Sequence, residues 1–190
     1  SGGVFYPDYF GKNFILNDLT HEGGLTAIRI EGPAISVDQR IERLSKELKL
    51  LSQEISILDT EQSNIFWNRT KNLEVFKNIK SNLLRIVVPM SETLQVIQKL
   101  KSNDVKYFID WGGSLIWASF DLLNTKILSE IKDIVKKHQG YITLIKVEED
   151  LKASADIFTI DPIKYKISEK IKRSFDPKRI FNPGKMYTGI

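Results

Sequence analysis

The chain has 190 residues, 42% hydrophobic and 27% charged, with a net charge of +4, which is typical of a globular domain. It contains no cysteine, and this excludes disulfides, thiolate metal sites and cysteine nucleophiles within the chain. No apolar run approaches the roughly 20 residues of a membrane-spanning helix, and the first residues show no signal-peptide pattern.

The first third of the chain predicts a strand, a helix and a second strand. Residues 25–31 alternate apolar and polar side chains, which indicates a half-buried strand. Ser36 and Gln39 have the spacing of a capping box, so we expect a helix to begin there. Its apolar face would consist of Val37, Ile41, Leu44, Leu48 and Leu51. Residues 54–58 favour a short strand, and residues 59–78, with Phe66 and Trp67, are helical or irregular.

The middle of the chain predicts six elements in the order β-α-β-β-α-β. They are a strand at 83–88, a helix capped by Ser91 with Leu94, Ile97 and Leu100 inward, a strand at 107–111, a return strand at 115–120 after a Gly112-Gly113 turn, a helix from Thr125 stopped at Gly140, and a strand at 141–147. This order is that of the ferredoxin-like split βαβ arrangement. We therefore predict an α+β fold: a ferredoxin-like antiparallel sheet with helices on one face, extended by an extra β-α-β and a C-terminal helix.

A further helix is predicted near the C-terminus. Asp161-Pro162 favours an N-cap followed by proline at the first helical position, and Asp176-Pro177 ends the helix. Its apolar positions are Ile163, Ile167, Ile171 and Phe175. Residues 162–190 contain eight Lys and Arg but two acidic residues, so this segment is either a solvated basic face or a surface for an anionic partner. In the turn-rich tail after it, we expect Ile180 and Phe181 to pack against something and the Asn-Pro-Gly backbone to be exposed. We divide the chain into a domain at 1–160 and a docking segment at 161–190.

Few residues suggest chemistry. His21 and His138 lack the spacing of a metal pair, so both are interpreted as structural and no metal site is expected. Arg85 interrupts an apolar strand, where its guanidinium either grips a substrate carboxylate or pairs with Asp110. No P-loop, G-x-G-x-x-G or G-x-S-x-G motif occurs, and the catalytic residues remain unknown. Phe108 and Trp111 lack the basic setting of an RNA-binding sheet, so no nucleic-acid partner is expected.

Several motifs together resemble one family. They are Phe66-Trp67 with Arg69, Leu-Arg-Ile-Val-Val-Pro at 84–89, Ile-Asp-Trp-Gly-Gly at 109–113 with Trp117, the run Ala-Ile-Arg-Ile-Glu-Gly-Pro at 27–33, and Phe-Asp-Pro-Lys-Arg-Ile-Phe-Asn-Pro-Gly-Lys-Met-Tyr at 175–187. Their order is similar to the C-terminal half of the glycolate oxidase FAD-binding subunits, within the FAD-linked oxidases. The resemblance covers roughly residues 20 to 190.

That resemblance implies a function for the chain as part of a larger flavoprotein. It implies the C-terminal part of a FAD-linked 2-hydroxy-acid (glycolate) oxidase, which helps to position substrate or to assemble the complex. It implies that the cofactor is FAD, bound mainly by an N-terminal domain absent from this chain, with Asn182 near the flavin. The implied partners are that FAD domain, a paralogous flavoprotein subunit and an iron–sulfur subunit.

The family's catalytic relatives carry a Glu-His metal motif that this sequence lacks. We therefore expect the chain alone to be inactive. We also expect it to be cytoplasmic, or peripheral to the inner membrane through its partners. The alternative function is a non-catalytic ferredoxin-like module for ligand binding or assembly.

Overall fold

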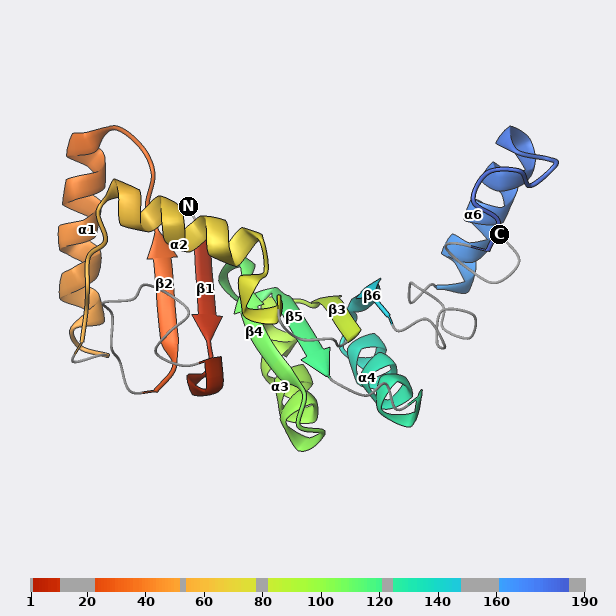
Figure 1. Cartoon of the computed structure of the whole chain (residues 1–190), viewed down its shortest axis with the longest axis horizontal. Coiled ribbons are helices and arrows are strands. Elements are labelled where there is room, and N and C mark those ends of the chain that lie inside the picture. The colour runs from red at the N-terminus through yellow and green to blue at the C-terminus, as the bar shows by residue number, and fades with distance from the viewer. Residues whose placement is uncertain are drawn as a thin grey trace. The chain divides into compact units, whose positions relative to one another are not determined.

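The computed structural model describes residues 2–10, 23–51, 54–77, 82–120, 125–147 and 161–184 (Figure 1). The chain divides into two compact units. The first comprises residues 1–78 and 110–112, and the second comprises residues 79–109 and 113–190.

The first unit is built on a pair of antiparallel strands. Strand β1 (Gly2–Tyr6) pairs with β2 (Leu25–Arg29), and Tyr6 lies opposite Leu25. The other elements of this unit are α1 (Ala34–Leu48), α2 (Thr60–Lys71) and short 3-10 turns at Asp8–Phe10 and Glu74–Phe76.

Buried contacts of Tyr6 fix α2 to β1. The Tyr6 hydroxyl donates to Thr70 Oγ1 at 2.9 Å, and the Thr70 hydroxyl donates in turn to the carbonyl of Phe66 at 3.0 Å. The rings of Tyr6 and Phe66 meet edge to face. Burial raises the pKa of the Tyr6 phenol, because a phenolate would lose its hydration there. The hydroxyl therefore stays protonated and serves as a structural donor.

Two predictions for this unit are wrong. Residues 54–59 form no strand, so the extra β-α-β does not exist. The strand that pairs with β2 is β1, whose Gly2 and Gly3 weaken the strand signal in the sequence. The start of α1 also differs, because the helix begins at Ala34 after Pro33 and uses no side-chain cap. A complete capping box occurs instead at α2, between Asp59 and Gln62.

The second unit contains the predicted β-α-β-β-α-β order. In chain order the elements are β3 (Asn82–Val87), a 3-10 turn (Met90–Glu92), α3 (Thr93–Ser102), β4 (Lys106–Asp110), β5 (Leu115–Phe120), α4 (Thr125–Lys137) and β6 (Tyr141–Lys146). Residues 110–112, at the end of β4 and the start of the turn Trp111–Gly113, are counted with the first unit. The strand order is β4-β5-β3-β6, with β3 antiparallel to both of its neighbours. This is the ferredoxin-like arrangement, and it confirms the predicted α+β fold class.

The core of this unit lies between the sheet and the helices α3 and α4. Strand β3 contributes Leu84 and Ile86, α3 contributes Val96 and Leu100, and both helices cover the same face of the sheet (Figure 1). The prediction that Leu94 points inward is wrong, because it is exposed and Val96 occupies the buried side of α3. Ser91 does not cap α3 either, because it lies inside the 3-10 turn and Glu92 is the N-cap residue.

Gly140 allows close packing where α4 turns into β6. A Cβ atom at this position would lie 2.3 Å from Val88 Cγ1 and 2.7 Å from the Val87 carbonyl oxygen. The left-handed residue of the turn is Gln139, with φ of 58°. Gly140 is thus required by the space available rather than by its backbone conformation.

Helix α6 (Pro162–Phe175) begins and ends as predicted. The Asp161 carboxylate accepts hydrogen bonds from the backbone amides of Ile163 and Lys164, at 2.8 and 3.4 Å. Asp176 follows the last helical residue. Among the described residues, no helix is long and apolar enough to cross a membrane.

Candidate functional site

Arg85 lies on the sheet face opposite the core of the second unit. Leu84 and Ile86 point into that core, and residues alternate between the two faces of a strand, so Arg85 points away from the helices. Its cross-strand partners are Trp117 on β5 and Thr143 on β6. All three side chains are half-buried.

The surroundings of Arg85 suit an anionic ligand. A guanidinium can hold a carboxylate through two parallel N–H bonds, and here it is flanked by an indole and a hydroxyl within the reach of cross-strand pairs. Tyr141, the partner of Val87, lies beside them on β6 and is exposed. The arrangement can bind and orient a small carboxylate. The alternative pairing of Arg85 with Asp110 stays a prediction, since these residues belong to different units.

Asp176 organises the C-terminal segment. Its carboxylate accepts the backbone amides of Ile180 and Phe181, both at 2.9 Å, and pairs with Lys172 Nζ at 2.6 Å. Lys172 also donates to the Phe181 carbonyl. The hydrogen bond from Lys172 first, and then the two amides, lower the pKa of Asp176 to about 2. The turn after α6 is therefore fixed to the helix by its own residues.

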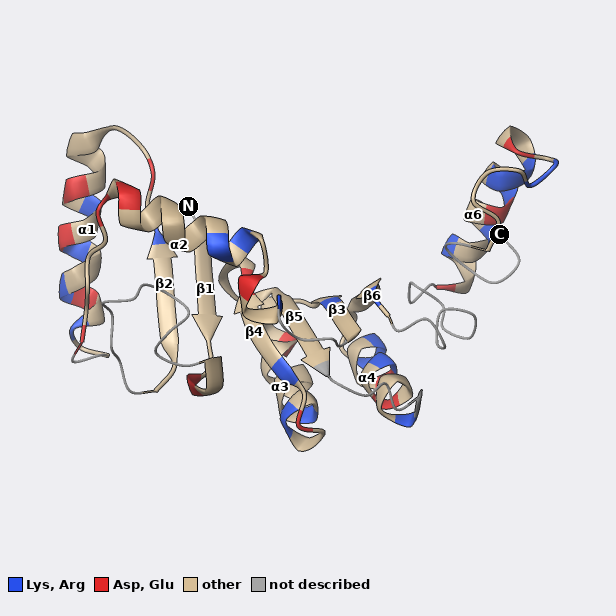
Figure 2. Cartoon of the chain, viewed as in Figure 1, with Lys and Arg blue, Asp and Glu red and all other residues tan. Residues whose placement is uncertain are grey.

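This segment presents its apolar side chains outward. Ile180 and Phe181 are 66% and 68% exposed, so the expected packing is not made within the described chain and stays a prediction. The stripe on α6 is exposed as well: Ile163, Ile167, Ile171 and Phe175. The other positions of α6 are mainly basic, with Glu169 as the one acidic residue of the helix (Figure 2): Lys164, Lys166, Lys170, Lys172 and Arg173. A helix of this kind has the pattern of an element that binds a partner.

Asn182 follows Ile180 and Phe181 in the turn that Asp176 fixes to α6, which we call the braced turn. It is exposed and adopts a left-handed conformation, with φ of 47°, and Gly184 follows with φ of 69°. Arg85 is on β3 and Asn182 is in the turn after α6, so the two predicted site residues come from different elements.

His138 has a side-chain partner that the sequence did not predict. His138 Nδ1 lies 2.6 Å from Glu92 Oε2, a contact between the end of α4 and the start of α3. The sequence could not predict this contact, because the two residues are 46 positions apart and only the packing of α3 and α4 brings them together. His21 lies outside the described residues. Within the described ranges, no group of three or more acidic or histidine side chains could hold a metal ion.

Comparison with known proteins agrees with the resemblance in the motifs. No family model matches the chain. Over 166 residues the chain is 26% identical to "Glycolate oxidase subunit GlcE" from Escherichia coli (strain K12). The match covers 86% of this chain and 39% of that protein, so the chain spans well under half the length of its relative.

Proposed function

We propose that this chain is the C-terminal, substrate-side part of a subunit of a FAD-linked 2-hydroxy-acid oxidase, with glycolate as the first candidate substrate. In this proposal it positions substrate and helps to assemble the flavoprotein, and it is inactive alone. The observation that carries the proposal is the C-terminal segment, where an exposed apolar stripe is joined to a turn braced by Asp176. The similarity to a glycolate oxidase subunit supports it.

The partner proposed for the C-terminal segment is a flavin-binding domain outside this chain. The matched relative is more than twice as long as the matched region, which leaves room for such a domain. An apolar stripe with basic flanks is stabilised by burial against a surface of complementary charge. Further proposed partners are a paralogous flavoprotein subunit and an iron–sulfur subunit of a cytoplasmic complex, held at the inner membrane only through those partners.

The proposed role of Arg85 is to hold the substrate carboxylate. FAD, when bound by its own domain, supplies the acceptor for the two electrons of the alcohol. The side chains of this unit bind and orient: the Arg85 guanidinium grips the carboxylate, and Trp117 and Thr143 limit its position. Asn182 contacts the flavin edge from the braced turn.

The first test is purification of the chain from its own host with its bound partners. A tagged chain is expected to bring down a yellow complex with flavin absorbance and glycolate-dependent dye reduction. Ile171→Asp places a charge in the exposed stripe and is expected to lose the flavoprotein, because a buried unpaired charge is costly. Lys166→Gln, on the same helix but outside the stripe, lowers the net charge by the same single unit and is the matched control; it is expected to keep most of the flavoprotein, because it removes one of several cations and leaves the stripe intact. A colourless complex, or equal recovery with both variants, would contradict the proposal.

The second test concerns Arg85 in that complex. Arg85→Met is expected to raise KM for glycolate about tenfold or more, with a smaller change in kcat, because it removes one charge-assisted hydrogen-bonded pair. Arg85→Lys keeps the charge without the fork and is expected to lie between the two. Lys146→Met removes an exposed cation from β6 of the same sheet and should leave KM unchanged. A variant that unfolds without a KM effect in the folded fraction would make Arg85 a structural residue.

A further inference from the structure

The first unit contains an open groove that none of the roles proposed above uses. It has a volume of about 850 Å³. The groove is lined by β1, β2, one side of α1 and the turn Asp110–Gly112, all of which belong to the first unit. Its volume is in the range of small-molecule sites, roughly 300–1,000 Å³.

Three arginines line the groove. Arg29 comes from β2, and Arg40 and Arg43 come from successive turns of α1, so that these two share one face of the helix. Arg29 pairs with Glu31 at 2.6 Å and Arg43 with Glu47 at 3.1 Å. Each of these two contacts engages one nitrogen of a group with five N–H donors, so donors remain for a bound anion.

An aromatic ring also lines the groove. Trp111 is 58% exposed and adopts a left-handed backbone conformation, with φ of 53°, which is a strained choice for a bulky residue. Such strain persists only where the surrounding structure imposes it. The result is an exposed indole in a groove that three arginines also line, and a ring of this kind is a platform for stacking.

Glycine backbone and one carboxyl complete the lining. Gly2, Gly3 and Gly112 have no side chains to fill the groove, and a Cβ atom added at Gly112 would meet nothing within 4 Å. Asp110 is half-buried, and its carboxylate accepts the backbone amide of Trp111 at 2.7 Å. The pKa of Asp110 is raised, because the effect of burial is larger than the opposite effect of that hydrogen bond. This carboxyl is available to bind a hydroxyl or ring nitrogen of a ligand.

We propose that this groove binds a nucleoside diphosphate, with the base stacked on Trp111 and the phosphates held by Arg29, Arg40 and Arg43. The chain has no glycine-rich phosphate loop, so the charge is met by side chains rather than by backbone amides. Three guanidiniums in one groove match a diphosphate better than a monophosphate. This inference is independent of the flavoprotein role, because it concerns another unit of the chain.

The test is calorimetric titration of the 190-residue chain with ADP at low salt, followed in parallel by tryptophan fluorescence. ADP is expected to bind and to quench the fluorescence. Trp111→Asn, which suits the left-handed backbone, is expected to remove the quenching. Arg43→Gln is expected to weaken binding about tenfold.

Arg173→Gln is the matched control for Arg43→Gln. Both arginines are on helices, both pair with a glutamate four residues away, and both are highly exposed, at 70% and 84%. Only Arg43 lines the groove, so ADP binding by Arg173→Gln should equal that of the unchanged chain.

Two partial ligands separate stacking from charge. Adenosine and pyrophosphate are each expected to bind at least tenfold more weakly than ADP. The proposal is overturned if ADP gives no binding heat, as it would in a groove that accepts an acidic peptide instead. It is also overturned if pyrophosphate binds as tightly as ADP, or if Arg43→Gln binds ADP as well as Arg173→Gln does.

Discussion

Helices α4 and α6 have the same kind of sequence and opposite surroundings. Each repeats isoleucine at helical spacing with charged residues between. In α4 this stripe packs on the sheet, and Ile131 is fully buried. In α6 the stripe is exposed, and Ile167 is 53% accessible although the helix is capped by Asp161 and its exit is braced by Asp176.

The difference teaches that a hydrophobic period predicts a face but not what covers it. Local signals, such as caps and end residues, are satisfied in α6 without help from a core. Burial is a tertiary property, and for α4 it comes from the strands of its own unit. The two helices therefore differ in what a substitution on the apolar face should do.

The largest expected effect comes from shortening one isoleucine in each helix. Ile131→Ala should cost about 2–5 kcal/mol of unfolding free energy, because it leaves a cavity in the core. Ile167→Ala should stay within about 0.5 kcal/mol, because its side chain is largely in water. Urea unfolding followed by circular dichroism measures both. Equal losses would mean that the stripe of α6 is buried within this chain.

A second pair adds a methyl group instead of removing one. Gly140→Ala should cost about 1–3 kcal/mol, because the new Cβ atom would collide with Val88 and the Val87 carbonyl. Gly184→Ala meets no atom within 4 Å and carries only the left-handed backbone penalty, roughly 1 kcal/mol. The same unfolding measurement compares them. A larger loss at Gly184 would show that the tail is packed more closely than its exposure indicates.

The braced turn should be sensitive to pH. The pKa of Asp176 is lowered to about 2 by Lys172 and two backbone amides, so its contribution is present above the ordinary value near 3.8 and is lost as the pH falls toward 2. Asp176→Asn should release the turn at neutral pH. Amide exchange of Ile180 and Phe181 measures this, and both amides should exchange faster in the variant. Protection that is unchanged at pH 2 and in the variant would contradict the assignment.

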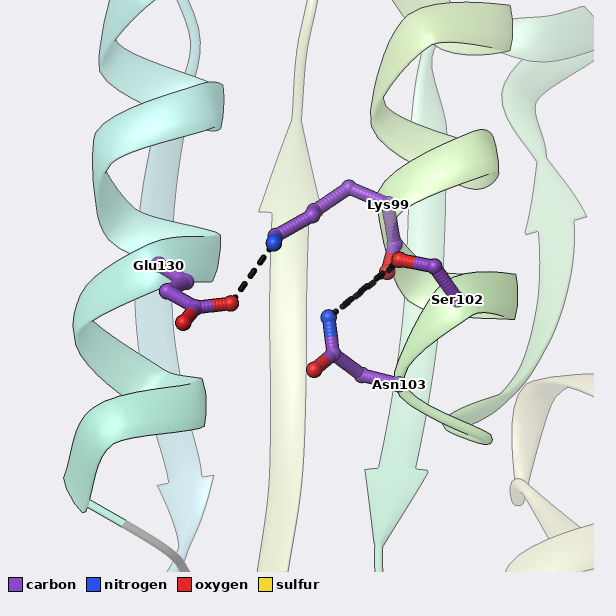
Figure 3. Close-up of polar contacts among 4 residues, drawn as sticks. All are labelled: Lys99, Ser102, Asn103 and Glu130. Atoms are coloured by element: carbon purple, nitrogen blue, oxygen red, sulfur yellow. Dashed lines mark hydrogen bonds and ion pairs between the residues drawn. The ribbon is translucent and has the colours of Figure 1, made fainter.

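The smallest effect is expected from a surface pair between α3 and α4. Lys99 Nζ lies 2.6 Å from Glu130 Oε2, and Asn103 contacts the Lys99 carbonyl and Ser102 beside it (Figure 3). The hydrogen bond from Lys99 lowers the pKa of Glu130, so the contribution is present above the usual carboxyl pKa and is lost in acid. Lys99→Met should shift the urea midpoint less than Gly184→Ala does. At high salt the midpoints of Lys99→Met and of the unchanged chain should coincide, because salt screens the ion pair.

The ferredoxin-like unit was predictable because each of its strands carries its own signal. The apolar runs, the Gly112-Gly113 turn and the stripe of α4 agree with one another and with a single topology. The first unit was harder, since β1 starts with two glycines and owes its strand conformation to pairing, including that with β2, rather than to its own residues. The run at 54–58 has strand-forming residues but no strand to pair with. Propensity alone could not distinguish these cases.

Of the candidate sites, too, one was predictable from a local signal in the sequence and another was not. Arg85 was singled out from the sequence because a cation interrupts an apolar run, and its strand then places it opposite the core. The arginine groove was not foreseen, because it joins β2, α1 and the turn at Asp110–Gly112, which are far apart in sequence. The contact between His138 and Glu92 was missed for the same reason.

The sequence by itself determined the fold class, the order of elements after residue 82 and the limits of α6, because these depend on periodicity and on local caps. Tertiary structure alone decided which partner β2 takes, which apolar faces are buried and which charged groups converge. Those outcomes depend on contacts between distant residues, whose free energy no local pattern contains.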